Sequence, residues 1–523
     1  MATESNSEVE KCDEVDRISD LPDSLLCHIL SFLQTKQTVA TATLSTRWKP
    51  VWTMVPSLDF QDTAERQQNQ GDNHGNNDLN MMFTQFVCRV LALREPVPLK
   101  KFRLLLSPYY FIDPTHLHTW ISYAIGHHVE EIHLFRVRTR SQPLELPPSL
   151  FSCKSLKTLM VHGDIIVNCP SSIHLPNLLC LGLLRIKYTD EESFHRLLTG
   201  SPNLLKLIVW RYQQDNMISF KISHPTLRLF FFDNQVQDPR FRLELNAPSL
   251  KHLLLWDRNC HGYLLHDVTN IIQANMFNLC EHGNFCNCML KLLSVLPNVQ
   301  SLTLRYNKPL GPGFYLPMFN NLRSLQLKVK CCKWQILLNL LQSAHNLETL
   351  TLNKMDIEGP HESCWIEPQE VPKCLESRLQ SFYFVRFSFL DHELELVKYI
   401  LKNAQVLKTM GIHNGVSNWE KEFFFRWEML DFPRASTSTQ LLSNASPSLM
   451  PSTNCNVSTS IFFNASPAAH PSVIPSAGFT NTGPPSPTLP SVAISASIAW
   501  QSLSKELFFF MVELYLGIEI VLF

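Results

Sequence analysis

The chain has 523 residues, of which 45% are apolar, so it is long enough for two or three domains with sizeable cores. Its formal net charge is −1, and this balance argues against a partner bound by charge alone, such as a nucleic acid or an anionic membrane. Residues 1–15 are acidic and polar, unlike a secretory signal or a transit peptide, and we expect them to be disordered. The 15 cysteines are scattered through apolar patterns, which is typical of buried thiols in a reducing compartment. We therefore expect the protein in the cytoplasm, the nucleus or both.

Residues 16–53 predict a small helical unit with a surplus of apolar side chains. A helix is expected from Pro22, because proline suits the first turn, and its apolar residues fall on one broad face. After a polar break, Leu44, Trp48 and Trp52 are spaced four apart and are expected to share a face of a second helix. About 40 residues cannot bury so much apolar surface alone. The surplus predicts contact with another surface, either as a helical cap on the rest of this chain or on a partner.

The same stretch closely resembles the F-box of plant proteins. The matching elements are Leu21-Pro22-Asp23, residues 29–33, Leu44-Ser45 and Arg47-Trp48, whereas Gln34 stands where many relatives carry proline. The resemblance implies binding to the Skp-type adaptor of a cullin-RING ubiquitin ligase. The adaptor-binding residues that it implies are Leu21, Pro22, Ile29, Leu30, Leu44 and Trp48.

A repeat dominates the next part of the chain. Residues 54–97 are expected to form a polar linker and a helix that ends before Pro96. A Leu-x-x-Leu-x-Leu pattern then recurs twelve times, mostly every 22–32 residues, starting at Leu99, Val129, Leu156, Leu178, Leu204, Leu227, Leu250, Val299, Leu322, Leu347, Leu379 and Leu407. The gap from Leu250 to Val299 predicts a degenerate copy between them. A strand and a helix per copy predict an α/β leucine-rich-repeat solenoid over residues 98–360, with a parallel sheet on its concave face.

Residues 361–436 resemble the FBD domain of plant F-box proteins, through residues 365–375, 395–408 and 432–436. We expect an α+β cap on the last repeats, with Val397, Ile400, Leu401 and Ala404 packing as a helical stripe. Residues 437–505 form a low-complexity segment that we expect to be disordered. The apolar segment 506–523 contains two glutamates, which makes it a poor membrane span and favours a short docking helix.

Catalytic patterns are lacking in the sequence: it contains no phosphate-binding loop, no nucleophile elbow and no dinucleotide fingerprint. Cys280, His282, Cys286 and Cys288 could hold zinc, but the spacing is tight and no second half of a zinc site follows. We therefore predict no metal, no cofactor and no enzymatic activity.

The repeats predict a place for a target protein. Alternation along a strand points Ile208, Phe231 and Leu254 away from the core as one apolar row, with Trp210 and Trp256 flanking Asp233 in the next row. Two alternatives stay open: another part of the chain covers this patch, or the register is shifted by one residue. With the F-box resemblance, the repeats predict a substrate-recognition subunit of an SCF-type ubiquitin ligase. The alternative is an F-box/LRR scaffold that binds partners without directing ubiquitin transfer.

Overall fold

The computed structural model describes residues 18, 20–62, 73–107, 110–140, 143–212, 215–236, 238–257, 262–277, 285–306, 316–329, 334–355, 365–414, 432–436 and 439–443. Cys280 and His282, for which no zinc site is predicted, and the segment 506–523 lie outside these residues.

The F-box region consists of short helices. They are α1 (Asp23–Leu30), α2 (Thr35–Ala40), η1 (Thr41–Thr43), α3 (Trp48–Val51) and η2 (Trp52–Met54). Pro22 is the N-cap of α1, one position before the first helical residue, and its extended backbone leads the chain into the helix. The predicted second helix is broken instead of continuous, because the chain leaves the α-helical hydrogen-bond pattern between α2 and α3.

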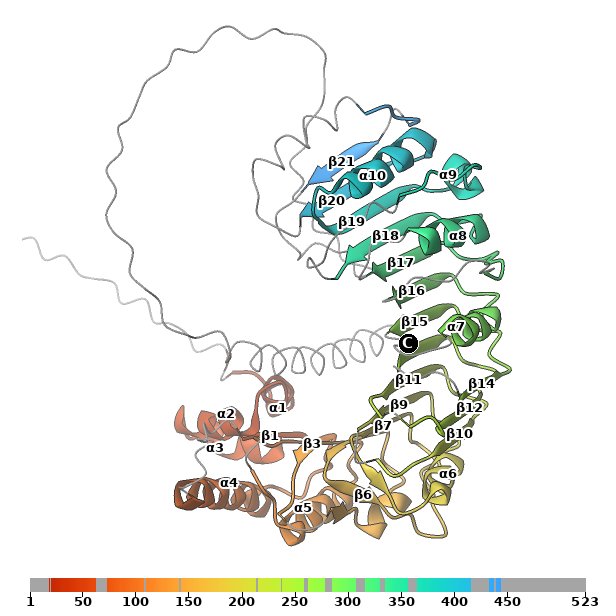
Figure 1. Ribbon diagram of the computed structural model, residues 1–523. Helices are drawn as coiled ribbons and strands as arrows, with labels where there is room; N and C mark the ends of the chain where they lie inside the picture. Colours follow the sequence, from red (N-terminus) through yellow and green to blue (C-terminus); the bar gives the residue numbers. More distant parts are fainter. Residues whose placement is uncertain are drawn as a thin grey trace, which may run out of the picture. The chain divides into compact units, whose positions relative to one another are not determined.

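One parallel sheet runs through the rest of unit 1, which comprises Met1–Met450. Its strands stack in chain order (Figure 1). They are β1 (Ser57–Gln61), β2 (Lys101–Leu105), β3 (Glu131–Val137), β5 (Thr158–Gly163), β7 (Cys180–Leu184), β9 (Lys206–Arg211), β11 (Leu229–Asn234), β13 (His252–Asp257), β15 (Gln273–Phe277), β16 (Ser301–Tyr306), β17 (Ser324–Val329), β18 (Thr349–Lys354), β19 (Ser381–Phe387), β20 (Thr409–Asn414) and β21 (Gln440–Ser443).

Helices and two small sheets connect these strands. The helices are α4 (Asn73–Leu93), α5 (Pro114–Gly126), η3 (Pro148–Ser152), α6 (Glu191–Thr199), α7 (Phe285–Ser294), α8 (Gln335–Ser343), α9 (Lys373–Ser377) and α10 (Asp391–Asn403). One small sheet consists of β4 (Leu144–Glu145), β6 (Ile165–Val167) and β8 (Lys187–Tyr188). The other consists of β10 (Ser219–Ser223), β12 (Arg242–Asn246) and β14 (Tyr263–His266). Each copy of the repeat thus contributes one strand to the main sheet, which confirms the predicted solenoid.

All twelve repeat copies supply strands, and their leucine positions form one continuous core. The degenerate copy is confirmed as β15, where Ile271, Ala274 and Met276 occupy the three core positions. Its alanine and methionine are the reason that the leucine pattern does not reveal it. Within the segment predicted as linker and helix, β1 adds a further strand before α4.

The FBD region continues the same sheet. It contributes β19 and β20 together with α9 and α10, and the stripe Val397, Ile400, Leu401 and Ala404 is buried as predicted. The cap is therefore built as further repeats and not as a separate layer. β21 pairs with β20 inside the segment predicted to be disordered, because Gln440–Ser443 can use the open hydrogen-bonding edge of β20.

Candidate functional site

Helix α1 of the F-box carries apolar residues on two faces. Leu26, Cys27 and Leu30 are buried against Trp48, Val51 and Val55, and this cluster is the small core of the F-box. Burial raises the pKa of the Cys27 thiol, so this cysteine is an inert core residue. The other face of α1 points to solvent.

The exposed face is defined by Pro22, Leu25, Ile29 and Phe32, which we call the α1 stripe. Leu25 and Ile29 are four residues apart and lie on one side of α1, Pro22 is its N-cap, and Phe32 follows in the turn after the helix. The exposed fractions are 48% for Leu25, 46% for Ile29 and 77% for Phe32. Ile18, Leu33 and Leu44 are also exposed, so six large apolar side chains between residues 18 and 44 face solvent. Such a concentration on so small a unit marks an interaction surface.

The predicted adaptor-binding residues therefore divide into two groups. Pro22, Ile29 and Leu44 are exposed and Leu21 is half-buried, whereas Leu30 and Trp48 are only 2% and 7% exposed. As a correction, Leu30 and Trp48 are core residues that hold the α1 stripe in place and do not belong to the surface. The shared face predicted for Leu44, Trp48 and Trp52 is also wrong, because the chain is interrupted between α2 and α3.

Polar contacts fix the F-box to its own entry and to the first strand. Arg47 forms an ion pair with Asp23 at 3.0 Å and donates a hydrogen bond to the Leu21 carbonyl at 2.6 Å. The Thr35 hydroxyl accepts a hydrogen bond from the Asp59 backbone N–H of β1 at 2.7 Å. The Arg47 contacts hold the start of α1, and the Thr35 contact joins α2 to β1.

The open face of the main sheet, which points away from the core, is the second candidate surface. Phe231 pairs in register with Ile208 on one side and Leu254 on the other. Asp233 likewise stands between Trp210 and Trp256. The predicted register is therefore confirmed.

Most of this predicted patch is buried, however. Ile208, Trp210 and Phe231 are 2%, 5% and 8% exposed, whereas Leu254 and Trp256 are half-buried. As a correction, Ile208, Trp210 and Phe231 are not accessible docking residues. Only Leu254 and Trp256 keep part of their surface open.

Neighbouring strands supply some of this cover. The His162 ring stacks on Trp210 with centroids 5.9 Å apart, and the Arg185 guanidinium lies 5.7 Å from the Trp210 ring. Burial, together with Arg185 and Arg136, lowers the pKa of His162 to about 3, so this histidine is neutral at physiological pH. An added Cβ at Gly182 would approach the Met160 sulfur to 2.2 Å, which shows that Met160 occupies the space over this glycine.

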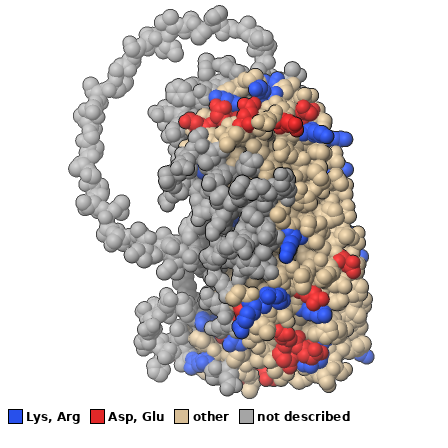
Figure 2. Space-filling model, turned by 45° about the vertical axis from the view of Figure 1, so that its right-hand side comes forward, with Lys and Arg blue, Asp and Glu red and all other residues tan. Residues whose placement is uncertain are grey.

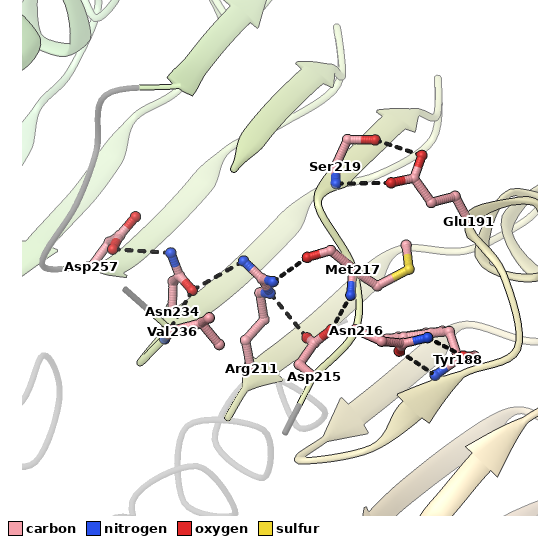
Figure 3. Close-up of polar contacts among 10 residues, drawn as sticks. All are labelled: Tyr188, Glu191, Arg211, Asp215, Asn216, Met217, Ser219, Asn234, Val236 and Asp257. Carbon is pink, nitrogen blue, oxygen red and sulfur yellow. Dashed lines mark hydrogen bonds and ion pairs between the residues drawn. The ribbon is translucent and has the colours of Figure 1, made fainter. Parts of the chain in front are cut away.

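Behind this row, the residues at the ends of β9, β11 and β13 form a buried polar ladder (Figure 3). Arg211 pairs with Asp215 at 2.9 Å and donates to Asn234 Oδ1 at 3.2 Å, and Asn234 donates to Asp257 at 3.1 Å. Asp257 accepts a further hydrogen bond from the Tyr263 hydroxyl. Burial raises the pKa of Asp215, and Arg211 offsets part of that rise. The ladder joins the main sheet to the β10–β12–β14 sheet and fixes the strand ends that carry Trp210 and Trp256.

An accessible aromatic pair lies next to this row. The rings of Trp256 and Phe277 are 5.0 Å apart, both are half-buried, and the Lys328 ammonium lies 4.8 Å from the Phe277 ring. Burial and the neighbouring Arg305 lower the pKa of Lys328. Phe277 escaped sequence reasoning because it belongs to the degenerate copy, and Arg305 and Lys328 belong to later copies, outside the predicted patch.

Three other kinds of site bear on function: metal centres, charged patches and membrane-spanning helices. No group of three potential ligands is placed to hold a metal ion within the described ranges. Figure 2 shows charged side chains of both signs gathered near the last repeats, where exposed pairs such as Lys398–Glu395 are spaced 3.6 Å apart. Exposed pairs of this kind form a solvated surface. No helix in the described part of the chain is long and apolar enough to cross a membrane.

Comparison with known sequences defines the class of protein. The F-box family model matches residues 18–60, the model described as "FBD-associated F-box protein At5g56370, LRR repeats" matches residues 117–292, and the FBD model matches residues 367–412. The order of these matches follows the helical unit, the repeat sheet and the last strands.

Full-length relatives carry the same combination. The chain is 33% identical over 419 residues to the F-box/FBD/LRR-repeat protein At4g00160 of Arabidopsis thaliana, covering 78% of this chain and 88% of that protein. It is 31% identical to the F-box/FBD/LRR-repeat protein At3g52680 of the same plant, covering 83% and 94%. The chain belongs to the plant family of F-box/FBD/LRR-repeat proteins.

Proposed function

We propose that this protein is the substrate-recognition subunit of an SCF-type ubiquitin ligase. The α1 stripe docks a Skp-type adaptor, which connects the chain to a cullin, and the open face of the repeats holds a target protein. The chain itself supplies no chemistry. It raises the effective concentration of the target beside the ubiquitin-conjugating enzyme.

The main support for this proposal is that α1 has apolar residues on both its buried face and its exposed face. One face supplies the core of the F-box, and the other leaves Leu25, Ile29 and Phe32 in solvent. Burying three such side chains in a partner contributes about 1.5–3 kcal/mol each when burial is complete. The F-box family supports a Skp-type adaptor as that partner.

Co-purification of the full-length chain with a Skp-type adaptor tests the docking. A Leu25→Asp/Ile29→Asp variant should lose the adaptor, because two carboxylates would have to enter an apolar interface. Ile218→Asp/Leu264→Asp is the matched control, since these residues are 51% and 54% exposed and lie outside the F-box. Unchanged adaptor recovery with the α1 variant, at equal stability, would refute the proposal.

Ubiquitin transfer needs a separate measurement. Targets bind through the repeats, so both the wild-type chain and the α1 variant should capture them. Captured targets should carry ubiquitin and accumulate when the proteasome is blocked in cells with the wild-type chain, and should show neither change in cells with the α1 variant. If captured proteins keep the same abundance and carry no ubiquitin, the chain is a binding scaffold and not a ligase subunit.

A further inference from the structure

The charges on the open face of the main sheet are mixed before β13 and cationic after it. Before β13, the outward positions include the carboxylates of Asp59, Glu131 and Asp233 and also the cations Lys101, Arg103 and Lys206. From β13 to β20 the outward positions in the described strands contain Arg305, Lys328, two histidines and no carboxylate. These positions are His252, Leu254, Trp256, Gln273, Asn275, Phe277, Ser301, Thr303, Arg305, Ser324, Gln326, Lys328, Thr349, Thr351, Asn353, Ser381, Tyr383, Val385, Thr409, Gly411 and His413. This half of the face therefore favours an anionic partner.

The two cations lie close together on this face. Arg305 of β16 pairs in register with Lys328 of β17, and neighbouring strands are about 4.8 Å apart. Lys328 is half-buried, and both burial and Arg305 disfavour its charged form. A carboxylate placed beside them would offset the repulsion between the two cations and would form charge-assisted hydrogen bonds.

An apolar ledge adjoins the cations. Leu254, Trp256 and Phe277 are each half-buried, and the Trp256 and Phe277 rings lie 5.0 Å apart. The Lys328 ammonium is only 4.8 Å from the Phe277 ring. Trp and Arg side chains are enriched among the residues that dominate binding energy at protein interfaces.

We propose that Leu254, Trp256, Phe277, Arg305 and Lys328 form a site for an unmodified peptide segment that carries an Asp or Glu close to a large apolar side chain. The carboxylate meets Lys328 and Arg305, and the apolar side chain packs on Trp256 and Phe277. This inference rests on the proposed function, since it names the kind of target that the repeats hold.

The geometry also limits the spacing of the two recognised groups. The cation and the aromatic ring are 4.8 Å apart, and an extended peptide advances about 3.3 Å per residue. The acidic residue and the apolar residue should therefore stand roughly one to three positions apart. A free anion would leave the aromatic ledge unused, and the ledge thus favours a peptide.

Selection from a phage-displayed library of random linear peptides on the immobilised full-length protein tests the site. Enriched peptides should carry Asp or Glu near Leu, Phe, Tyr or Trp. Lys328→Glu should weaken a synthetic peptide of this sequence at least about thirtyfold, and Phe277→Ala about tenfold. Lys251→Glu, an exposed lysine just before β13, is the matched control and should leave the affinity unchanged.

Two further changes, one in the protein and one in the peptide, test the role of the charge itself. Lys328→Met removes the charge without reversing it, and it replaces Lys328→Glu if that variant does not fold. Replacing the peptide's acidic residue by Asn or Gln should cause a similar loss. Absence of any enriched peptide, enrichment without acidic residues, or equal affinity for the Lys328 variants would overturn the proposal, as would binding only by phosphoserine peptides. Peptide affinity does not involve the adaptor, so its outcome is independent of adaptor co-purification.

Discussion

The α1 stripe and the middle of the main sheet both place large apolar side chains on a face directed away from a core. Phe32 on the F-box is 77% exposed, whereas Phe231 on β11 is 8% exposed. A strand inside a parallel sheet has neighbours about 4.8 Å away on both sides. Large side chains on those neighbours shield its outward side chains from solvent. A short helix at the edge of a small unit has no such neighbours. A similar apolar residue therefore stabilises the fold in the sheet and is free to bind a partner on α1.

The largest loss of folding stability is expected in the buried polar ladder behind Ile208, Phe231 and Leu254. Arg211→Met removes the only positive charge of the described ladder and leaves Asp215 and Asp257 buried without it. Breaking a buried ion pair in this way costs about 3–5 kcal/mol of folding free energy, measured by urea unfolding. Arg240→Met, which removes an exposed partner of Asp238, should leave the midpoint unchanged. Equal midpoints for the two variants would mean that the ladder does not stabilise the sheet.

Trp210 and Trp256 provide the next comparison, because they occupy equivalent positions with different burial. Trp210→Ala removes a side chain that is 5% exposed and should cost about 3 kcal/mol. Trp256 is half-buried, and Trp256→Ala should cost about half as much. Thermal unfolding of both variants measures the difference. A larger loss for Trp256 would contradict the burial that the structure gives to this row.

His162 makes the cover of Trp210 sensitive to pH. Its pKa is lowered from 6.5 to about 3 in the folded protein, so the unfolded chain binds more protons between these values. Stability should therefore fall as pH decreases below 6.5, by about 2 kcal/mol at pH 5 from this group. His162→Phe should reduce the slope of stability against pH, and the exposed His195→Phe should not. Identical slopes in wild type and His162→Phe would show that this histidine is not buried in its neutral form.

The smallest effect on stability is expected on the α1 stripe. Phe32→Ser changes a side chain that is 77% exposed and should alter the folding free energy by less than about 0.5 kcal/mol. Leu30→Ala, two positions away in sequence but 2% exposed, should cost about 2–5 kcal/mol. Chemical denaturation of the two variants separates surface from core. A substantial loss with Phe32→Ser would mean that the stripe packs within this chain.

Much of the fold follows from sequence, because the repeat pattern records a local rule. Each Leu-x-x-Leu-x-Leu copy predicts a strand and its buried face, and the register of Phe231 with Ile208 and Leu254 is confirmed on this basis. The copy around Phe277 escaped individual recognition because Ala274 and Met276 replace its leucines. The strand β21 could not be predicted, since its pairing depends on the free edge of β20 and not on its own pattern.

The candidate surfaces were harder to predict than the fold. Periodicity gives the direction of a side chain, but exposure depends on neighbours that are distant in sequence. Trp210 is partly covered by His162 and Arg185 from other strands, and Trp48 is packed against the opposite face of α1. Phe277 and Lys328 come together from separate strands, so no local motif connects them.

Hydrogen–deuterium exchange of the full-length protein, with and without a Skp-type adaptor, tests the contrast between the two regions most directly. Peptides that cover residues 22–33 should gain protection when the adaptor binds, because the α1 stripe is then buried. Peptides that cover β9, Lys206–Arg211, should exchange equally in both samples, since this strand is already covered by the chain itself. Bound adaptor with no added protection at residues 22–33 would contradict the assignment of the α1 stripe as its docking surface.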